Sequence, residues 1–190
     1  MFLLGRVMAR AAVGRLAGWA PCAWPWREGP HGRPEIASDD TSLRFNIAHS
    51  AGVVVCAAAD GVDIGVDVED LERPATDIEV VRRYCAPAEV RDIAAAGPDG
   101  WRTRFLYYWT LKEAYLKARG LGISLPLAEI EFTLASPPRV AFLGSLQGTD
   151  TRWAFHLQQI SDRHLAAVAA EAPVRDPSVE MAPFPADWLP

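Results

Sequence analysis

The sequence contains few cysteines, no excess of basic residues and no long hydrophobic run. Its three cysteines, Cys22, Cys56 and Cys85, lie far apart and form no C-x-x-C pair. This number and spacing argue against a disulfide framework and against a zinc site built on cysteines. Sparse, unpaired cysteines are typical of proteins in the reducing cytoplasm, where we expect this protein to act.

The charge and the apolar runs exclude two further classes of protein. The formal net charge is −5, whereas sequence-independent nucleic-acid binders usually carry a basic excess, so we expect no nucleic-acid partner. The longest apolar runs, such as residues 53–59, are too short to cross a membrane, so we expect no membrane association. Near the start, arginines interrupt the apolar stretch that a secretory leader requires. Apolar side chains recur there at helical spacing and predict an amphipathic helix.

The remaining sequence alternates between strand and helix patterns. Apolar residues make up 50% of 190 residues, enough for a substantial core. We expect helices over residues 77–84, 87–96 and 101–119, and irregular structure over residues 18–40. Strands are expected over residues 43–47, 52–59, 63–69, 129–134, 139–143, 152–160 and 164–170.

This order of elements predicts an α+β fold built from two similar α/β units that join near Asp70. The corresponding divisions are an N-terminal half over residues 1–70, a C-terminal half over 71–171 and a proline-rich tail over 172–190.

The most informative segment is the predicted strand that ends at Asp70. Alternate strand residues share a face, so Asp67 and Glu69 point away from Val66 and Val68. The two carboxylates then lie about 7 Å apart along the strand. Such a pair suits magnesium, which takes oxygen ligands and keeps water or phosphate in its other positions. The alternative is a solvated turn with scattered acids.

A second informative segment is the helix around residue 113. Glu113 and Lys117 lie one turn apart at the edge of an apolar arc, and Lys112 falls inside that arc. A Glu–Lys pair at this spacing is common on solvated helices. A lysine within the apolar arc, however, needs an anion or a route to water, and a bound phosphate would meet that need. Glu113 would then complete a three-carboxylate magnesium site with Asp67 and Glu69.

One of the four histidines has an informative sequence context. His49 follows a predicted strand and precedes Ser50, Ala51 and Gly52, a turn whose backbone amides can face an anion. His49 is therefore a candidate donor to a phosphate oxygen. His31, His156 and His164 have no comparable context.

Together these segments resemble the 4′-phosphopantetheinyl transferase superfamily, in particular the longer type similar to the surfactin synthetase activator. The resemblance is carried by several motifs in order: Gly32-Arg33-Pro34, Phe45–Ser50, Gly65-Val66-Asp67-Val68-Glu69, Trp109 with Lys112, Glu113 and Lys117, and Gly120–Leu127. It covers about residues 31–127. Each motif alone is weak, whereas their order and spacing are specific.

The resemblance implies a pseudo-dimer of two α/β halves with coenzyme A between them. Family members have a longer N-terminal region, so the N-terminal half is expected to be shortened here. Asp67, Glu69 and Glu113 would hold Mg²⁺ against the pyrophosphate. The implied coenzyme A contacts are His31, Gly32, Arg33, Pro34, Ile36, His49, Ser50 and Lys117.

The implied activity transfers the phosphopantetheine arm of coenzyme A to a serine of an acyl or peptidyl carrier protein and releases 3′,5′-ADP. Lys112 and Lys117 would stabilise the leaving phosphate, and either Glu113 or a metal-bound water would accept the serine proton. We expect a monomer. Two alternatives are a coenzyme A binding relative without catalytic activity and a metal-dependent phosphohydrolase that uses the same carboxylates on water.

Overall fold

The first half of the chain folds as a helix across a hairpin. The structure is a computed structural model that describes residues 2–20, 24–29, 32, 34–38, 41–73, 77–122, 124–148, 152–172 and 179–185. Helix α1 (Phe2–Ala17) packs on the antiparallel strands β3 (Leu43–Ser50) and β4 (Val53–Asp60). The short strands β1 (Trp26–Glu28) and β2 (Pro34–Ile36) pair beside them.

The second half places a long helix across a three-stranded sheet. Strand β9 (His164–Glu171) lies between β5 (Ile64–Asp70) and β8 (Trp153–Gln159), and both pairs are antiparallel. Helix α4 (Gly97–Arg119) packs on β5 and β9. The other elements are α2 (Ile78–Tyr84), α3 (Pro87–Ala95), η2 (Leu127–Glu129), β6 (Ile130–Thr133), β7 (Arg139–Phe142) and η3 (Gly144–Leu146).

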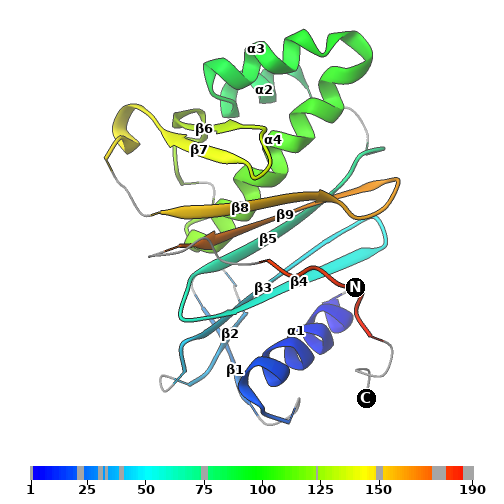
Figure 1. Cartoon of the computed structure of the whole chain (residues 1–190), viewed down its shortest axis with the longest axis vertical. Helices are drawn as coiled ribbons and strands as arrows, with labels where there is room; N and C mark the ends of the chain where they lie inside the picture. The colour runs from blue at the N-terminus through cyan, green and yellow to red at the C-terminus, as the bar shows by residue number, and fades with distance from the viewer. Residues whose placement is uncertain are drawn as a thin grey trace.

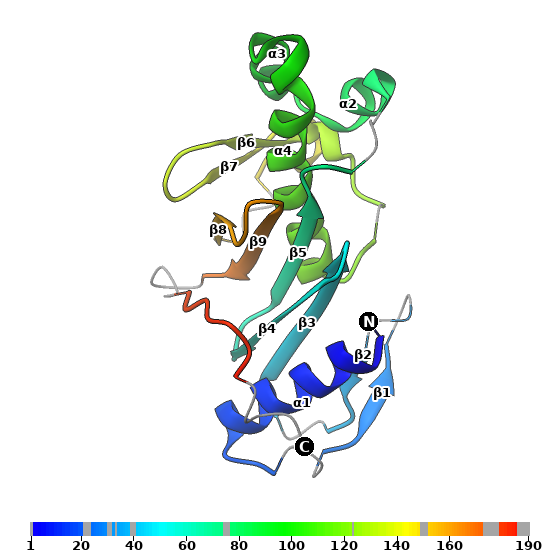
Figure 2. The same cartoon turned by 90° about the vertical axis from the view of Figure 1, so that its right-hand side faces the viewer.

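These elements form a mixed α/β fold arranged in layers. Figure 1 shows α4 on one side of the strands and α1 on the other, and Figure 2 shows β3 and β4 between α1 and β5. Alternation along each strand divides its side chains between two layers. Val66 and Val68 of β5 pack with Ala48 and Ala57 of the hairpin, while Gly65 faces α4. The predicted alternation along β5 is therefore confirmed.

Two stretches depart from the sequence prediction. Part of residues 18–40, expected to be irregular, forms the paired strands β1 and β2, and Trp24 and Trp26 pack against Phe45. Gly97 and Pro98, expected to end a helix, begin α4 directly after α3. Gly97 has a φ of +74°, and proline suits a first helical turn.

Among the described helices, none is long and apolar enough to cross a membrane.

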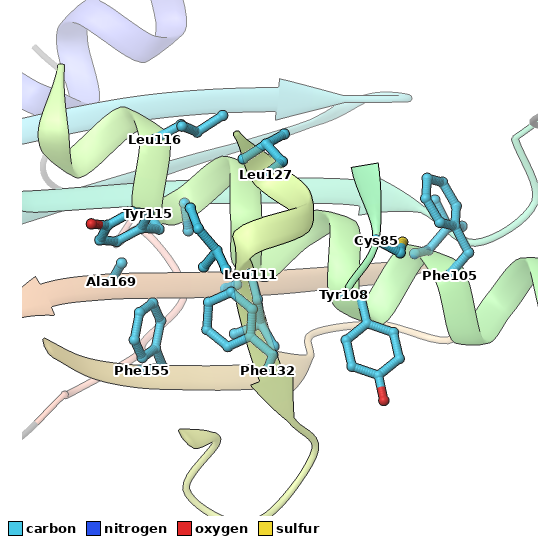
Figure 3. Packing of buried hydrophobic residues seen from close by; sticks show 14 of the residues in the cluster. Cys85, Phe105, Tyr108, Leu111, Tyr115, Leu116, Leu127, Phe132, Phe155 and Ala169 are labelled. Carbon is cyan, nitrogen blue, oxygen red and sulfur yellow. The ribbon is translucent and has the colours of Figure 1, made fainter. Parts of the chain in front are cut away.

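The largest hydrophobic core surrounds α4. Leu111 and Tyr115 of this helix contact aromatic side chains from β6 and β8, including Phe132 and Phe155, as Figure 3 shows. The rings of Phe132 and Phe155 meet edge to face with centroids 4.7 Å apart. The apolar arc predicted for this helix is thus its buried face.

Lys112 lies inside this core, and this position corrects the expectation that its ammonium contacts a phosphate. Its side chain is fully buried, and its ammonium lies 2.9 Å from Glu89 Oε2 of α3. It also donates to the carbonyl oxygens of Leu127, at 2.8 Å, and Ile130. An ammonium has three protons, and these three acceptors use them. Lys112 therefore has a structural anion inside the protein, which the sequence pattern did not reveal.

Glu89 is equally enclosed. Its carboxylate accepts hydrogen bonds from the backbone amides of Ala86, at 2.7 Å, and Phe132, at 2.8 Å. Burial raises the pKa of Glu89 and lowers that of Lys112, while each charge favours the ionised form of the other. The pair joins α3, α4 and β6 through a buried polar network.

Gly65 sets the distance between β5 and α4. A Cβ atom at this position would clash with the carbonyl oxygen of Ala114 and the amide nitrogen of Ala118, both in the helix backbone. Backbone atoms cannot rotate away as a flexible side chain can, so any larger residue must separate the strand from the helix. The glycine of the carboxylate motif thus has a packing role.

We predict that Gly65→Ala lowers the free energy of unfolding by roughly 2–3 kcal/mol, because overpacking here displaces backbone. Chemical denaturation measures the change. Gly100→Ala is the matched control, since Gly100 lies in α4 and its added Cβ would approach only the Ala96 side chain, at 3.3 Å. The packing role of Gly65 is wrong if both variants have wild-type stability.

We predict that Lys112→Met costs about 3–5 kcal/mol of stability, because it leaves Glu89 buried without its cation. Arg82→Met, in an ion pair whose two side chains are 65% and 68% exposed, should change stability by less than about 1 kcal/mol. Denaturation curves of both variants test this contrast. A Lys112→Met protein of normal stability would contradict the structural role.

Candidate active site at the end of strand β5

Two carboxylates of β5 face helix α4. Asp67 and Glu69 alternate with Val66 and Val68, so they share the face of Gly65, which touches Ala114 and Ala118. All seven residues of β5 are buried. The strand thereby holds two acidic side chains where little water reaches them, against the C-terminal half of α4.

Asp67 is paired with a lysine from α4. Lys117 Nζ donates to Asp67 Oδ1 at 2.6 Å. The other oxygen, Oδ2, is buried and has no hydrogen-bond partner among the described residues. A buried carboxylate oxygen without a donor costs free energy, so this atom is a candidate ligand for a cation or an ordered water.

Glu69 is also paired with a basic side chain. Arg73, just beyond the strand, donates from Nη1 to Glu69 Oε2 at 2.7 Å. Burial raises the pKa of Glu69, the bond from Arg73 opposes that rise, and the charge of Asp67 adds to it. The pKa of Glu69 therefore depends both on Arg73 and on Asp67.

Helix α4 brings a third carboxylate, Glu113, near the two on β5. Glu113 lies one helical turn before Lys117 and is half-buried. Its pKa is raised, first by burial and then by the charges of Asp67 and Glu69, while Lys117 lowers it. Glu113 thus lies close enough to both strand acids for their charges to affect its ionisation.

A metal-ligand arrangement is not formed in this structure. Over the part of the chain that the structure describes, no three His, Cys, Asp or Glu side chains are placed to hold a metal ion together. The donor set itself suits magnesium, because it offers carboxylate oxygens and the unpaired Oδ2 of Asp67. Two of the three acids are meanwhile occupied by Lys117 and Arg73.

His49 and Ser50 end strand β3, just before its turn into β4, and lie at the same end of the strands. Arg44 is within 3.9 Å of Asp63, and Asn46 Oδ1 accepts from the Val66 amide at 2.9 Å. Residue numbers rise together on β3 and β5, so the two strands run in the same direction and their C-terminal ends meet. His49 is exposed there and Ser50 is half-buried.

The remaining predicted coenzyme A contacts fall elsewhere or outside the described residues. Pro34 and Ile36 line a hollow of about 360 Å³ near the start of β3, together with Arg44. Ile36 is itself buried in the core. Gly32 is exposed, with a φ of +76°. The predictions for His31 and Arg33 lie outside the described residues.

Three partners in these networks were missed from the sequence. They are Arg73 on Glu69, Glu89 on Lys112 and the side chain of Asn46 between two strands. Arg73 alone had a signal in the sequence, because it follows Glu69 by four residues. The others are contacts between distant segments.

Comparison with known proteins identifies the family of the chain. The model of the 4′-phosphopantetheinyl transferase superfamily matches residues 63–169. A 4′-phosphopantetheinyl transferase of Bacillus subtilis is 32% identical over 139 residues, which are 73% of this chain and 60% of that protein. The 4′-phosphopantetheinyl transferase HetI of Nostoc sp. is 33% identical over 174 residues, covering 90% of this chain and 70% of that protein.

A solved structure, the holo-[acyl-carrier-protein] synthase of Thermotoga maritima, aligns with 57% of this chain and 62% of its own, with 22% identity and a TM-score of 0.47. The chain thus spans only part of the relatives that it matches, 60% of the Bacillus protein.

The family match covers more than half of the chain and includes the carboxylates of β5 and the acid and lysine of α4. The chain belongs to the 4′-phosphopantetheinyl transferase superfamily.

Proposed function

We propose that the protein transfers the 4′-phosphopantetheine arm of coenzyme A to a serine of an apo acyl or peptidyl carrier protein, with magnesium as cofactor. The observation that carries the proposal is that Glu113 lies within the electrostatic influence of Asp67 and Glu69, with one buried oxygen of Asp67 left without a donor. The family match and the names of the curated relatives support the reaction type.

Asp67, Glu69 and Glu113 would hold the magnesium ion. When bound, such an ion neutralises charge on a diphosphate and orients it for attack. Lys117 already lies within the carboxylate cluster, 2.6 Å from Asp67. Its ammonium would donate to a phosphate oxygen instead of Asp67 when coenzyme A binds. The same lysine would thus neutralise Asp67 in the free protein and a phosphate in the complex, so no second basic residue is needed for the phosphate.

Glu113 is the candidate acceptor of the serine proton. Its raised pKa, caused by burial and by the neighbouring acids, makes it a stronger base than an exposed glutamate. His49 and Ser50 would contact a coenzyme A phosphate from the turn at the same strand end. Lys112 is left out of the mechanism because its ammonium is enclosed within the core.

A basic surface on α2–α4 is the proposed docking site for an acidic carrier protein. Arg82, Arg83, Arg91 and Arg102 are exposed, and Arg104 is half-buried. Arg82 and Arg104 already pair with Glu79 and Asp92. The docking proposal therefore rests mainly on the other three arginines.

We also propose that the two expected halves, residues 1–70 and 71–171, are related subdomains. Each places one long helix across neighbouring strands, α1 in the first half and α4 in the second. Strand β5, which falls within the first half in sequence, is nevertheless hydrogen-bonded to β9 of the second.

The transfer proposal predicts that an apo carrier protein, incubated with this protein, coenzyme A and Mg²⁺, gains the mass of one phosphopantetheine group. Intact-protein mass spectrometry measures the gain, and 3′,5′-ADP should appear in equal amount. Glu113→Gln should abolish the reaction, because an amide cannot accept the serine proton.

Control reactions separate the alternatives. Coenzyme A breakdown without any carrier would indicate a phosphohydrolase. Binding of coenzyme A with no change in the mass of any carrier would indicate a non-catalytic relative. Activity of Glu113→Gln within a few-fold of wild type would remove Glu113 from the mechanism.

The pairing of Lys117 with Asp67 generates a separate prediction for the metal. Lys117→Met should tighten the binding of Mn²⁺, used as a probe for Mg²⁺, by about tenfold, because a competing cation is removed from Asp67. Electron paramagnetic resonance measures free Mn²⁺ directly. Arg119→Met is the control, since Arg119 bonds to the Tyr115 hydroxyl rather than to the acids. Equal affinities in all three proteins would show that Lys117 does not compete.

A further inference from the structure

The turn between β3 and β4 adopts an unfavourable backbone conformation for its sequence. Ser50 pairs with Val53, so the loop consists of Ala51 and Gly52. Both have positive φ, 38° and 91°. Glycine adopts such angles freely, whereas the left-handed region is unfavourable for alanine. Two-residue loops of this kind favour Asn-Gly or Gly-Gly, so the conformation of Ala51 needs support from outside the hairpin.

His164, the first residue of β9, supplies a contact to this turn. Its side chain is buried, and Nε2 lies 3.3 Å from the carbonyl oxygen of Ala51. A carbonyl oxygen can only accept, so Nε2 carries the proton of this bond. Nδ1, 2.9 Å from Ser161 Oγ, is then the acceptor in a neutral ring.

Ser161 fixes the orientation of the ring. Its Oγ accepts from the backbone amides of Arg163, at 3.2 Å, and His164, at 3.1 Å. Because these amides occupy its lone pairs, its hydroxyl proton points to Nδ1 of His164. The hydrogen bonds thus run in one direction, from Ser161 through the imidazole to Ala51.

The same β8–β9 turn also holds the end of β5. Arg163 donates from Nε to Asp70 Oδ1 at 2.6 Å and from Nη2 to Oδ2 at 2.5 Å. The Leu71 amide donates to the Arg163 carbonyl oxygen at 2.8 Å. The adjacent residues Arg163 and His164 therefore contact the strand that bears the carboxylates and the turn that follows His49 and Ser50.

We propose that His164 is a positioning residue that fixes the β3–β4 turn through the Ala51 carbonyl and so presents His49 and Ser50 to a phosphate of coenzyme A. The inference rests on the proposed function. Loss of this bond loosens the turn and weakens binding of the nucleotide end. The acids of β5 and α4 keep their own contacts, so turnover at saturating coenzyme A is preserved.

Two substitutions of His164 separate its two hydrogen bonds. The amide nitrogen of glutamine is as many bonds from Cβ as Nε2, and the amide oxygen of asparagine matches Nδ1. His164→Gln should keep the affinity for 3′,5′-ADP within about twofold of wild type. His164→Asn keeps only the Ser161 contact and should weaken this affinity about fivefold, which corresponds to one hydrogen bond.

Three measurements test the proposal. Calorimetry measures the affinity for 3′,5′-ADP, steady-state kinetics separates KM for coenzyme A from kcat, and amide hydrogen exchange follows residues 49–54. In His164→Asn we expect a raised KM, kcat within about twofold and faster exchange in the turn. His164→Gln should behave as wild type. The control is His156→Asn, because His156 contacts Gln158 on its own strand β8.

The outcomes distinguish this inference from the proposed function. Wild-type exchange and affinity in His164→Asn would overturn the positioning role. Faster exchange in that variant, together with a wild-type protein that binds no 3′,5′-ADP, would support the hold on the turn and overturn the proposed function instead. If His164→Asn does not fold, Ser161→Ala frees the ring to rotate and should show the same changes at smaller size; its failure to do so counts against the proposal.

Discussion

The close approach of α4 to β5 is the constraint on which the site depends. Gly65 has no side chain, so the helix backbone at Ala114 and Ala118 can lie directly on the strand. At this distance Lys117 reaches Asp67, and the charges of both strand acids raise the pKa of Glu113. A larger residue at position 65 would move the two halves of the cluster apart. The packing requirement and the chemistry of the carboxylates are therefore met by one short motif.

Neighbouring residues of α4 have opposite surroundings. Lys112 points into the core and completes a network with Glu89 that joins three elements. Glu113 points toward β5 and joins the acids there. A helix advances about 100° per residue, so consecutive side chains face different neighbours. Lys112 holds in place the helix that carries Glu113, which explains how a lysine beside a candidate active-site acid can have a structural role.

The acidic cluster is partly neutralised by the protein's own cations. Lys117 and Arg73 each bond to one acid, and one oxygen of Asp67 stays without a donor within the described structure. Three carboxylates in a half-buried site repel one another unless positive charge is nearby. The two basic residues lower that repulsion, and a divalent ion would lower it further. An arrangement of this kind allows the fold to form before substrate or metal binds.

The sequence alone determined most of the helices and strands, the alternation of apolar and acidic residues along β5, and the buried arc of α4. These features follow from local periodicity, which the backbone geometry of each element dictates. Tertiary structure decided that Lys112 meets Glu89, that Trp26–Glu28 pairs with Pro34–Ile36, and that His164 contacts Ala51. Such contacts join segments distant in the chain, and no periodic pattern encodes which buried polar group will meet which partner. They are set by the packing of whole elements, because a buried donor or acceptor must find its partner among the groups that this packing brings within reach.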